Sequence, residues 1–481
     1  MPNPQAPGVY IEEIATLPAS VAPVATAIPA FVGYTERVSY QGEDLTNTPK
    51  RITSLLEFRE IYGGPAAEPF TITVTGEVDD PSVAVSRAAD PADRPPYILY
   101  YHMQMYFANG GGPCHIVTVG TYTVSTPFNM DGSELATGLA AAELEDEVTL
   151  LVVPEAVQLS GTPGARATLH DAMLAQCARL QDRFSIMDAL VVADPEDPDS
   201  DGDTFRGDVG ADNLKYGAAY YPSLNTFIPY YYTDDTTIED DRTGDDAGPY
   251  HDRTLTVIRD GQDTGDPTDI EPDKTLYNLI LAELQKHTVH LYPSGAMAGI
   301  YARVDRERGV WKAPANVGVQ RVKKPDVLVT EEEQGFLNVH PGSGKSVNVI
   351  RRFEGKGNLV WGARTLAGND NEWRYINVRR LFIFVEESCK KASEFVVFEP
   401  NDAKTWLRVK TMIENFLTQL WREGALAGAK PDDAFRVNIG LGITMTPLDI
   451  LEGRMNVEIA MAAVRPAEFI ILKFSHKLQE S

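Results

Sequence analysis

The sequence predicts a mixed α/β (α+β) protein organised in several domains. Short apolar runs bounded by glycine and proline alternate with segments whose apolar residues recur every three or four positions, as buried strands and amphipathic helices do. The chain has 481 residues, 43% of them hydrophobic, which suffices for about three domains with their own cores. A highly acidic stretch, residues 194–273, interrupts the alternation. We therefore expect several α/β parts, with an exposed acidic insertion between them.

A strand, a helix and a second strand are predicted in the first half of the chain. Residues 115–119 and 148–153 are short apolar runs near glycine and proline, which is typical of buried strands. A helix follows, and residues 186–193 are predicted to form the next strand. The apolar face of that helix consists of Leu169, Met173, Cys177, Leu180 and Phe184.

Three helices are predicted after the acidic stretch. Asp273 is placed to cap the first, because its side chain can accept hydrogen bonds from the first turn. Two longer helices start near Asn377 and Asp402, where apolar residues again recur at helical spacing. Gly424 is placed to end the last one, because glycine readily adopts the left-handed conformation found at helix ends.

Three strands are predicted towards the C-terminus. Residues 435–443 and 455–461 alternate apolar with polar or small residues, which indicates half-buried strands. Residues 468–474 are apolar enough to form a buried strand close to the chain end.

These patterns divide the chain into five parts. They are an extended N-terminal arm (1–25), a core α/β part (26–193), the acidic surface insertion (194–273), a continuation of the core (274–370) and a C-terminal domain (371–481) that ends in a terminal strand or arm at about 463–481.

Charge is distributed unevenly along the chain, and its sign argues against a nucleic-acid-binding protein. The formal net charge is −26, with −30 in residues 1–300 and +4 in residues 301–481. Residues 194–273 hold 22 acids against 5 bases, so we expect them to be exposed turns and short strands that favour solubility. Such acidity counts against nucleic-acid binding, which uses Lys and Arg to neutralise phosphates.

Compartment and membrane insertion can also be predicted. Cys114, Cys177 and Cys389 lie far apart, which argues against a disulfide framework and a thiolate metal site and favours a reducing compartment. No apolar run approaches the ~20 residues needed to cross a bilayer, and the N-terminus does not resemble a signal peptide. We therefore expect neither export directed by a signal peptide nor direct membrane insertion.

Motifs for catalysis fail on spacing. Residues 342–346, Gly-Ser-Gly-Lys-Ser, end like a phosphate-binding loop, but Val339 stands where the motif needs its first glycine. No serine lies in a Gly-x-Ser-x-Gly elbow, and His287 and His290 have neither zincin nor zinc-finger spacing. We therefore expect no enzyme and no organic cofactor.

One metal motif is kept as an alternative. Residues 197–208 place acids at positions 1, 3, 5, 7 and 12 of a calcium loop, with Gly202 at position 6. Position 12 is Asp rather than Glu, and prolines flank the segment where a helix should enter. The segment is either a calcium site of a soluble binding protein or an acidic solvated loop. The candidate ligands are Asp197, Asp199, Asp201, Asp203 and Asp208.

Both chain ends carry a short predicted strand on an extended segment. Such a strand can pair with the sheet of a neighbouring subunit by β-augmentation, or it can join its own sheet as an edge strand. The candidate residues are Val9, Tyr10, Ile11 and Glu12 at one end and Phe469, Ile470, Ile471 and Leu472 at the other.

Several separate motifs resemble those of contractile tail sheath proteins of phages and phage-like injection systems. The likeness is patchy over residues 1–120 and nearly continuous over residues 290–481. The motifs are residues 7–13 (Pro-Gly-Val-Tyr-Ile-Glu-Glu), 107–111, 294–305, 308–316, 360–366, 375–381 and 398–402. Residues 194–273 look longer than the compact core of this family needs.

The resemblance implies a sheath-like fold and a structural function. Sheath subunits of this family stack as hexameric rings in a helical tube around a rigid inner tube, and their terminal arms exchange strands. A baseplate trigger then lets the sheath contract and drive the inner tube through a target envelope. The resemblance further implies a sheath-like core, built from both chain ends with extended terminal arms, that lies inward against the tube, while inserted domains such as the acidic insertion face solvent.

The resemblance also implies partners and a location. The partners would be copies of this chain, an inner tube protein, and baseplate and terminal cap proteins, in a particle assembled in the cytoplasm, with release from the cell left open. Phage tails, tailocins, type VI systems and other injection systems fit alike. Basic residues of the late helices are candidates for the tube-facing surface, with a solvated helix face as the plain alternative. They are Arg379, Arg380, Lys390, Lys391, Lys404 and Arg408.

Overall fold

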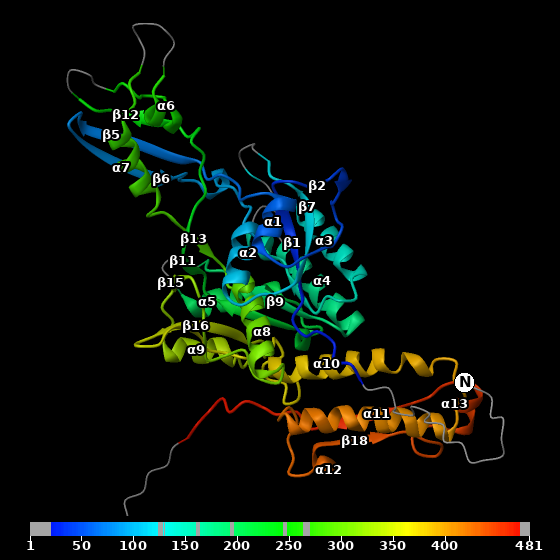
Figure 1. The fold of residues 1–481 in the computed structure, drawn as a ribbon. Helices are drawn as coiled ribbons and strands as arrows, with labels where there is room; N and C mark the ends of the chain where they lie inside the picture. Colours follow the sequence, from blue (N-terminus) through cyan, green and yellow to red (C-terminus); the bar gives the residue numbers. More distant parts are fainter. Residues whose placement is uncertain are drawn as a thin grey trace, which may run out of the picture. The chain divides into compact units, whose positions relative to one another are not determined.

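The computed structural model describes residues 21–123, 128, 130–159, 164–192, 197–243, 248–262 and 270–471 (Figure 1). The chain divides into two compact units. The core unit contains residues 25–383 and the segment that begins at residue 465, and the C-terminal unit contains residues 384–464 and the end of the N-terminal segment up to residue 24. The division falls inside helix α10 (Ile376–Ala392), whereas the sequence predicted a C-terminal domain from residue 371.

The core unit is built on a nine-stranded sheet. Its six central strands, from β16 to β7, run parallel, and antiparallel strands extend it at both edges. Every residue of β1 is buried, as expected for parallel strands covered on both faces. In order the strands are β14 (Val317–Gly318), β17 (Gly357–Val360), β16 (Val347–Phe353), β10 (Gly217–Tyr221), β9 (Phe184–Asp188), β8 (Leu150–Val152), β1 (Pro29–Thr35), β7 (Cys114–Thr121) and β4 (Lys50–Ile52).

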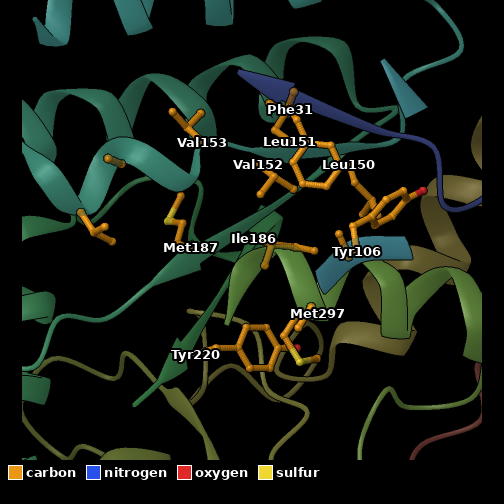
Figure 2. Close-up of a cluster of buried hydrophobic side chains, with 14 of the residues drawn as sticks. Phe31, Tyr106, Leu150, Leu151, Val152, Val153, Ile186, Met187, Tyr220 and Met297 are labelled. Carbon is orange, nitrogen blue, oxygen red and sulfur yellow. The ribbon is translucent and has the colours of Figure 1, made fainter. Parts of the chain in front are cut away.

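Helices and strands contribute side chains to one continuous apolar core. Figure 2 shows Phe31, Leu151 and Ile186 of three neighbouring strands, with Tyr106 and Met297 contributed by two helices. The helices of the core unit around this sheet are α1 (Leu55–Tyr62), α2 (Leu99–Ala108), α3 (Gly132–Ala141), α4 (Ala165–Leu180), α5 (Pro198–Asp208), α8 (Ser294–Arg308) and α9 (Glu331–Asn338).

Helices α2 and α8 pack closely because α8 carries glycine where they meet. A Cβ atom added at Gly299 would lie 2.3 Å from the Tyr106 carbonyl oxygen, and one at Gly295 would lie 2.9 Å from the His102 carbonyl oxygen. Neither distance is compatible with a side chain larger than hydrogen. The motif 294–305, which carried part of the family resemblance, therefore owes its two glycines to helix packing.

A second, smaller apolar core lies within the core unit. It is formed by a β-hairpin, one further strand and two helices, and includes Ile72, Ile238 and Leu276. Asp273 caps α7 by accepting a hydrogen bond from the Leu276 N–H, as predicted. The elements of this small core are β5 (Phe70–Glu77), β6 (Asp80–Arg87), β12 (Ile238–Asp240), α6 (Leu255–Asp260) and α7 (Lys274–Leu284).

The predicted acidic surface insertion, residues 194–273, is wrong in its boundaries. Strand β10 lies inside that range, yet all five of its residues are buried in the middle of the large sheet. The small core, in turn, takes residues 70–87 from far outside the range. Acidic composition dominates the stretch and concealed the short apolar strand within it. Two small antiparallel sheets complete the core unit: β11 (Leu224–Pro229) with β13 (Thr288–Leu291) and β15 (Val322–Pro325), and β2 (Ser39–Tyr40) with β3 (Glu43–Asp44).

The helices and strands predicted from periodicity are confirmed in most cases. The runs 115–119, 148–153 and 186–193 correspond to β7, β8 and β9, and the helix between the last two is α4. Helix α11 starts after Asp402, whose carboxylate accepts a hydrogen bond from the Thr405 N–H, and ends at Arg422 just before Gly424. In the described residues, no helix combines the length and apolarity needed to span a membrane.

The C-terminal unit consists of two long helical segments and a two-stranded sheet. The apolar face of α11 includes Ile413 and Phe416, and Phe416 contacts Phe384 of α10 with 5.9 Å between ring centroids. The predicted strands 435–443 and 455–461 are present but shorter, because Gly440 and Gly442, both with positive φ, turn the chain after β18. Its elements after α10 are α11 (Ala403–Arg422), α12 (Pro431–Ala434), β18 (Phe435–Asn438), α13 (Pro447–Leu451) and β19 (Glu458–Met461).

The predicted buried strand 468–474 is wrong for the residues that the structure describes. Residues 468–471 form no strand within this chain, and Phe469, Ile470 and Ile471 are 70%, 78% and 80% exposed. The apolar composition of this run predicted burial, but among the described residues it joins no sheet.

Candidate assembly surfaces at the chain ends

The N-terminal segment is fixed where it enters the described part of the chain. The Val24 N–H donates to the Ser388 hydroxyl at 3.2 Å within the C-terminal unit. In the core unit, the Thr26 carbonyl accepts a hydrogen bond of 2.8 Å from the Arg380 guanidinium, and the Ile28 N–H donates to the Thr149 hydroxyl at 2.8 Å. Strand β1 begins directly afterwards, so residues 26–28 are fastened within the core unit just before the main sheet starts.

Arg380 belongs to a buried ion pair rather than to a surface. Its two terminal nitrogens bind the carboxylate of Asp305 on α8 at 2.9 and 2.5 Å, and its guanidinium lies 4.6 Å from the centre of the Tyr301 ring. Both charged side chains are buried. Burial alone would lower the pKa of Arg380, but the Asp305 charge and hydrogen bonds raise it above its usual value.

The prediction that Arg379 and Arg380 face the tube is therefore wrong. The guanidinium of Arg379 is also buried, 4.6 Å from the Trp373 ring centre and 5.1 Å from that of Tyr216. Both arginines lie in the part of α10 that packs in the core unit. Their long side chains stack on aromatic rings, which a charge count along the sequence cannot reveal.

The other four basic candidates are at the surface of the C-terminal unit. Lys390 pairs with Glu387 at 3.1 Å and stays 63% exposed, and Lys391 lies 3.5 Å from the same carboxylate. Lys404 is exposed, and the guanidinium of Arg408 lies 4.7 Å from the centre of the Phe395 ring. Their contact with an inner tube remains a prediction.

The C-terminal segment is held at one residue, Glu468. Arg364 binds both of its oxygens, at 2.9 Å through Nε and 2.7 Å through a terminal nitrogen. Asn338 and Tyr375 donate to the same carboxylate at 2.8 and 3.1 Å. Burial by itself raises the pKa of Glu468, but the hydrogen bonds from Arg364 and Asn338 and the charge of Arg364 outweigh it, and the net pKa is lowered. Sequence reasoning missed this cluster, because its members are far apart in the chain.

The predicted arm strand begins just beyond Glu468, and its residues 469–471 are exposed. The exposure of Phe469, Ile470 and Ile471 agrees with a segment that has its partner elsewhere, but the pairing itself remains a prediction. The other predicted arm residues, Val9 to Glu12 and Leu472, lie outside the described residues.

The C-terminal unit exposes several further apolar side chains. Phe398 is fully exposed, and Leu451 is 83% exposed. Its sheet has two strands in the described residues, and a sheet of that size leaves backbone groups unpaired along its outer edges. The exposed apolar residues of this unit are Val397, Phe398, Leu407, Leu441, Ile443, Leu448 and Leu451.

The candidate calcium segment is a helix. Asp197 caps α5 by accepting from the N–H groups of Asp199 and Ser200, and Pro198 takes the first helical position. The calcium hypothesis assumed that residues 197–208 form a loop, and this assumption is wrong. The other acids of the motif, Asp199, Asp201, Asp203 and Asp208, lie on helix α5 instead.

Their carboxylates also have other partners. Asp201 is buried and accepts hydrogen bonds from the Val192 N–H and the Tyr221 hydroxyl, both at 2.7 Å. Asp203 pairs with Arg206, and Asp208 with Arg166. Within the described ranges there is no group of three or more acidic, histidine or cysteine residues arranged to hold a metal ion.

Comparison with known proteins identifies the family. The phage tail sheath C-terminal domain family matches residues 368–477. The tail sheath protein of Burkholderia phage BcepMu is 30% identical over 142 residues, 28% of this chain and 29% of that protein, and that of Vibrio phage KVP40 is 25% identical over 184 residues, 38% of this chain and 26% of that protein. The matched stretch thus spans less than a third of these relatives.

Solved structures match over nearly the whole chain. The sheath complex of the extracellular contractile injection system PVC, in its contracted state, is 30% identical, with a TM-score of 0.64 over 98% of both chains. The contracted helical sheath of the anti-feeding prophage is 33% identical, with a TM-score of 0.64 over 98% of this chain and 100% of the other. The chain therefore belongs to the contractile tail sheath family. Its similarity over nearly the whole chain is to these contracted sheaths.

Proposed function

We propose that this protein polymerises as stacked hexameric rings around an inner tube and contracts to drive that tube through a target envelope. The observation that carries the proposal is the similarity along the whole chain to sheath subunits solved in the contracted state. On this proposal the protein is a structural component without a catalytic site. It assembles in the cytoplasm with the inner tube, baseplate and terminal cap proteins, and it acts as part of the finished particle.

Strand exchange through the two arms would connect the subunits. The exposed run Phe469–Ile471 supports this, since an exposed apolar segment can be covered by pairing with a sheet edge. The two-stranded sheet β18–β19 offers such an edge in a neighbouring copy. Backbone hydrogen bonds formed this way do not depend on side-chain packing, so subunits can change their mutual orientation while they stay linked.

Contraction would require no bound nucleotide. The extended sheath is a metastable lattice on this proposal, and the contracted lattice has the lower free energy, so the stored difference performs the work. The trigger at the baseplate would only have to lower the free-energy barrier between the extended and the contracted lattice of the same subunits.

Electron microscopy of negatively stained samples tests the assembly. The full-length protein, expressed with its inner tube protein, should form striated tubes, and a variant lacking residues 1–25 should stay folded but form none. Circular dichroism serves as the control for folding. Striated tubes of normal length from the deletion variant would contradict strand exchange by the N-terminal arm.

Charge reversal tests the tube-facing surface. Lys390→Glu with Lys404→Glu should weaken attachment of the inner tube, because two exposed positive charges of the C-terminal unit become negative. Lys356→Glu, an exposed lysine of the core unit, is the matched control. Equal amounts of tube in sheaths of both variants would reject the assignment.

A further inference from the structure

The C-terminal segment changes character at one residue. Glu468 is bound by Arg364, Asn338 and Tyr375, whereas the next three residues are exposed. A carboxylate that accepts hydrogen bonds from three different side chains, one of them a guanidinium in two-point contact, is among the strongest polar attachments in proteins. The attachment therefore ends where the predicted arm strand starts.

The residues that hold Glu468 are themselves tied to the main sheet. Arg364 is buried, and a terminal nitrogen donates to the Gly368 carbonyl at 3.0 Å. Its backbone N–H donates at 2.8 Å to the side chain of Asn348 on β16. The amide of Asn348 in turn donates to the carbonyl of Ala219 on the neighbouring strand β10. Hydrogen bonds through Arg364 and Asn348 thus connect Glu468 to the central strands of the main sheet.

The base of the N-terminal arm is built in a comparable way. There the guanidinium of Arg380, paired with the buried Asp305, donates to the Thr26 carbonyl, and the Ile28 N–H donates to the Thr149 hydroxyl. Both ends of the chain are therefore fastened to the core by a buried arginine. The C-terminal case is the more specific, since Arg364 binds the charged side chain of the segment and not only its backbone.

We propose that Glu468 is a positioning residue for assembly: its attachment to Arg364, Asn338 and Tyr375 fixes the point and direction in which the C-terminal strand leaves the core. This inference rests on the proposed strand exchange between subunits. Without the anchor, the free tether would start at the end of the C-terminal unit at Val464, and the strand would search a larger volume. A preorganised strand loses less conformational entropy on pairing, and its effective concentration at the neighbouring sheet is higher.

The test compares assembly thresholds of purified variants with the inner tube protein present. Glu468→Gln should raise the protein concentration at which sheaths sediment by about tenfold, the factor equivalent to ~1.4 kcal/mol. Tyr375→Phe, which removes one hydrogen bond and leaves Arg364 paired, should raise it about two- to threefold. Glu354→Gln, at an exposed glutamate of the core unit, is the matched control and should assemble like the wild type.

Two further measurements separate positioning from folding. Hydrogen exchange of the backbone amides in residues 465–468 should accelerate in both variants, while exchange in β16 stays unchanged. A variant lacking residues 469–481 should fold and fail to assemble. A wild-type threshold for Glu468→Gln, when the deletion abolishes assembly, overturns the anchor alone. Normal assembly of the deletion variant overturns strand exchange by this arm, and the anchor with it. Faster exchange throughout β16 would show that the Gln variant loosens the core, which also overturns a positioning role.

Discussion

The core unit and the C-terminal unit bury their apolar side chains to different extents. The core unit surrounds a nine-stranded sheet whose central strands are buried on both faces. The C-terminal unit has a two-stranded sheet and carries seven large apolar side chains that solvent reaches. A two-stranded sheet is at best marginally stable on its own. The core unit buries most of its apolar residues although it also exposes Phe469–Ile471, while the C-terminal unit exposes many for its length, as a surface that another molecule covers does.

The same contrast applies to charge, and helix α10 contains both cases. Arg380 is buried against Asp305 in the core unit, whereas Lys390 pairs with Glu387 at the surface of the C-terminal unit. A buried charge that loses its partner is strongly destabilising, and an exposed pair contributes little. Substitutions of matched residues in the two units therefore test this contrast.

The largest effect is expected for the buried ion pair. Asp305→Asn should lower the free energy of unfolding of the core unit by about 3–5 kcal/mol, because Arg380 is left buried without a counter-charge. Lys390→Ala should cost less than about 1 kcal/mol. Urea denaturation followed by fluorescence reports on the core unit in a background that lacks Trp406 and Trp421, and on the C-terminal unit in a background that lacks Trp311, Trp361 and Trp373. Equal losses in the two variants would contradict the contrast.

Identical substitutions of leucine should have opposite consequences in the two units. Leu151→Ala, in the middle of the main sheet, should cost about 2–5 kcal/mol because it leaves a cavity. Leu451→Ala, at a residue that is 83% exposed, should change stability by no more than about 0.5 kcal/mol.

Assembly should rank the two leucine variants the other way round. Leu451→Ala should reduce sheath formation at a protein concentration where folded Leu151→Ala still assembles, as measured by sedimentation below the melting temperature of both. Unchanged assembly of Leu451→Ala would show that its exposure has no role in the lattice.

Two carboxylates, Glu155 in the core unit and Asp402 in the C-terminal unit, should make the stability of their units change with pH in opposite directions. Burial raises the pKa of Glu155 to about 8, even though the N–H groups of Tyr34, Ile98 and Leu99 donate to it. The folded core then holds a proton that the unfolded chain releases near pH 4.5, so stability falls as the pH rises from about 5 to 8. The pKa of Asp402 is lowered by its capping hydrogen bond from Thr405, so its contribution is present above about pH 4 and is lost as the pH falls further.

Thermal melts between pH 3 and 9 would check both signs. Glu155→Gln should flatten the decline of the core unit between pH 5 and 8, with Asp188, whose pKa burial raises to about 7, as the remaining contributor. An unchanged slope in the Gln variant would mean that Glu155 is ionised in the folded protein.

The smallest effect is expected for a single helix cap. Asp402→Ala should lower the melting temperature of the C-terminal unit by a few degrees, because the first turn of α11 loses its side-chain acceptor. Asp402→Ser should restore most of the loss, since a serine hydroxyl caps well. A drop of equal size in both variants would mean that the charge near the helix terminus matters more than the cap.

Much of the fold could be predicted because its signals are local. Strands β7, β8 and β9, helix α4, and the caps at Asp273 and Asp402 follow from spacing within a few residues. The predicted boundaries of the insertion were wrong, because the acidic composition averaged over residues 194–273 concealed the buried strand β10. The tube-facing prediction failed for Arg379 and Arg380 because a charged residue type was taken as evidence of exposure.

Local patterns along the chain are enough to predict the periodic helices, the strands between them, the presence of an apolar run near the C-terminus and the family that the short motifs suggest. Only the tertiary structure decided which arginines are buried, which strands join across the sheet and where each arm is fastened. The physical reason is distance along the chain: Glu468 is 104 residues from Arg364, and Arg380 is 354 residues from Thr26. Periodicity reports on neighbours within one or two turns, whereas these contacts exist because the topology of the sheet brings distant segments together.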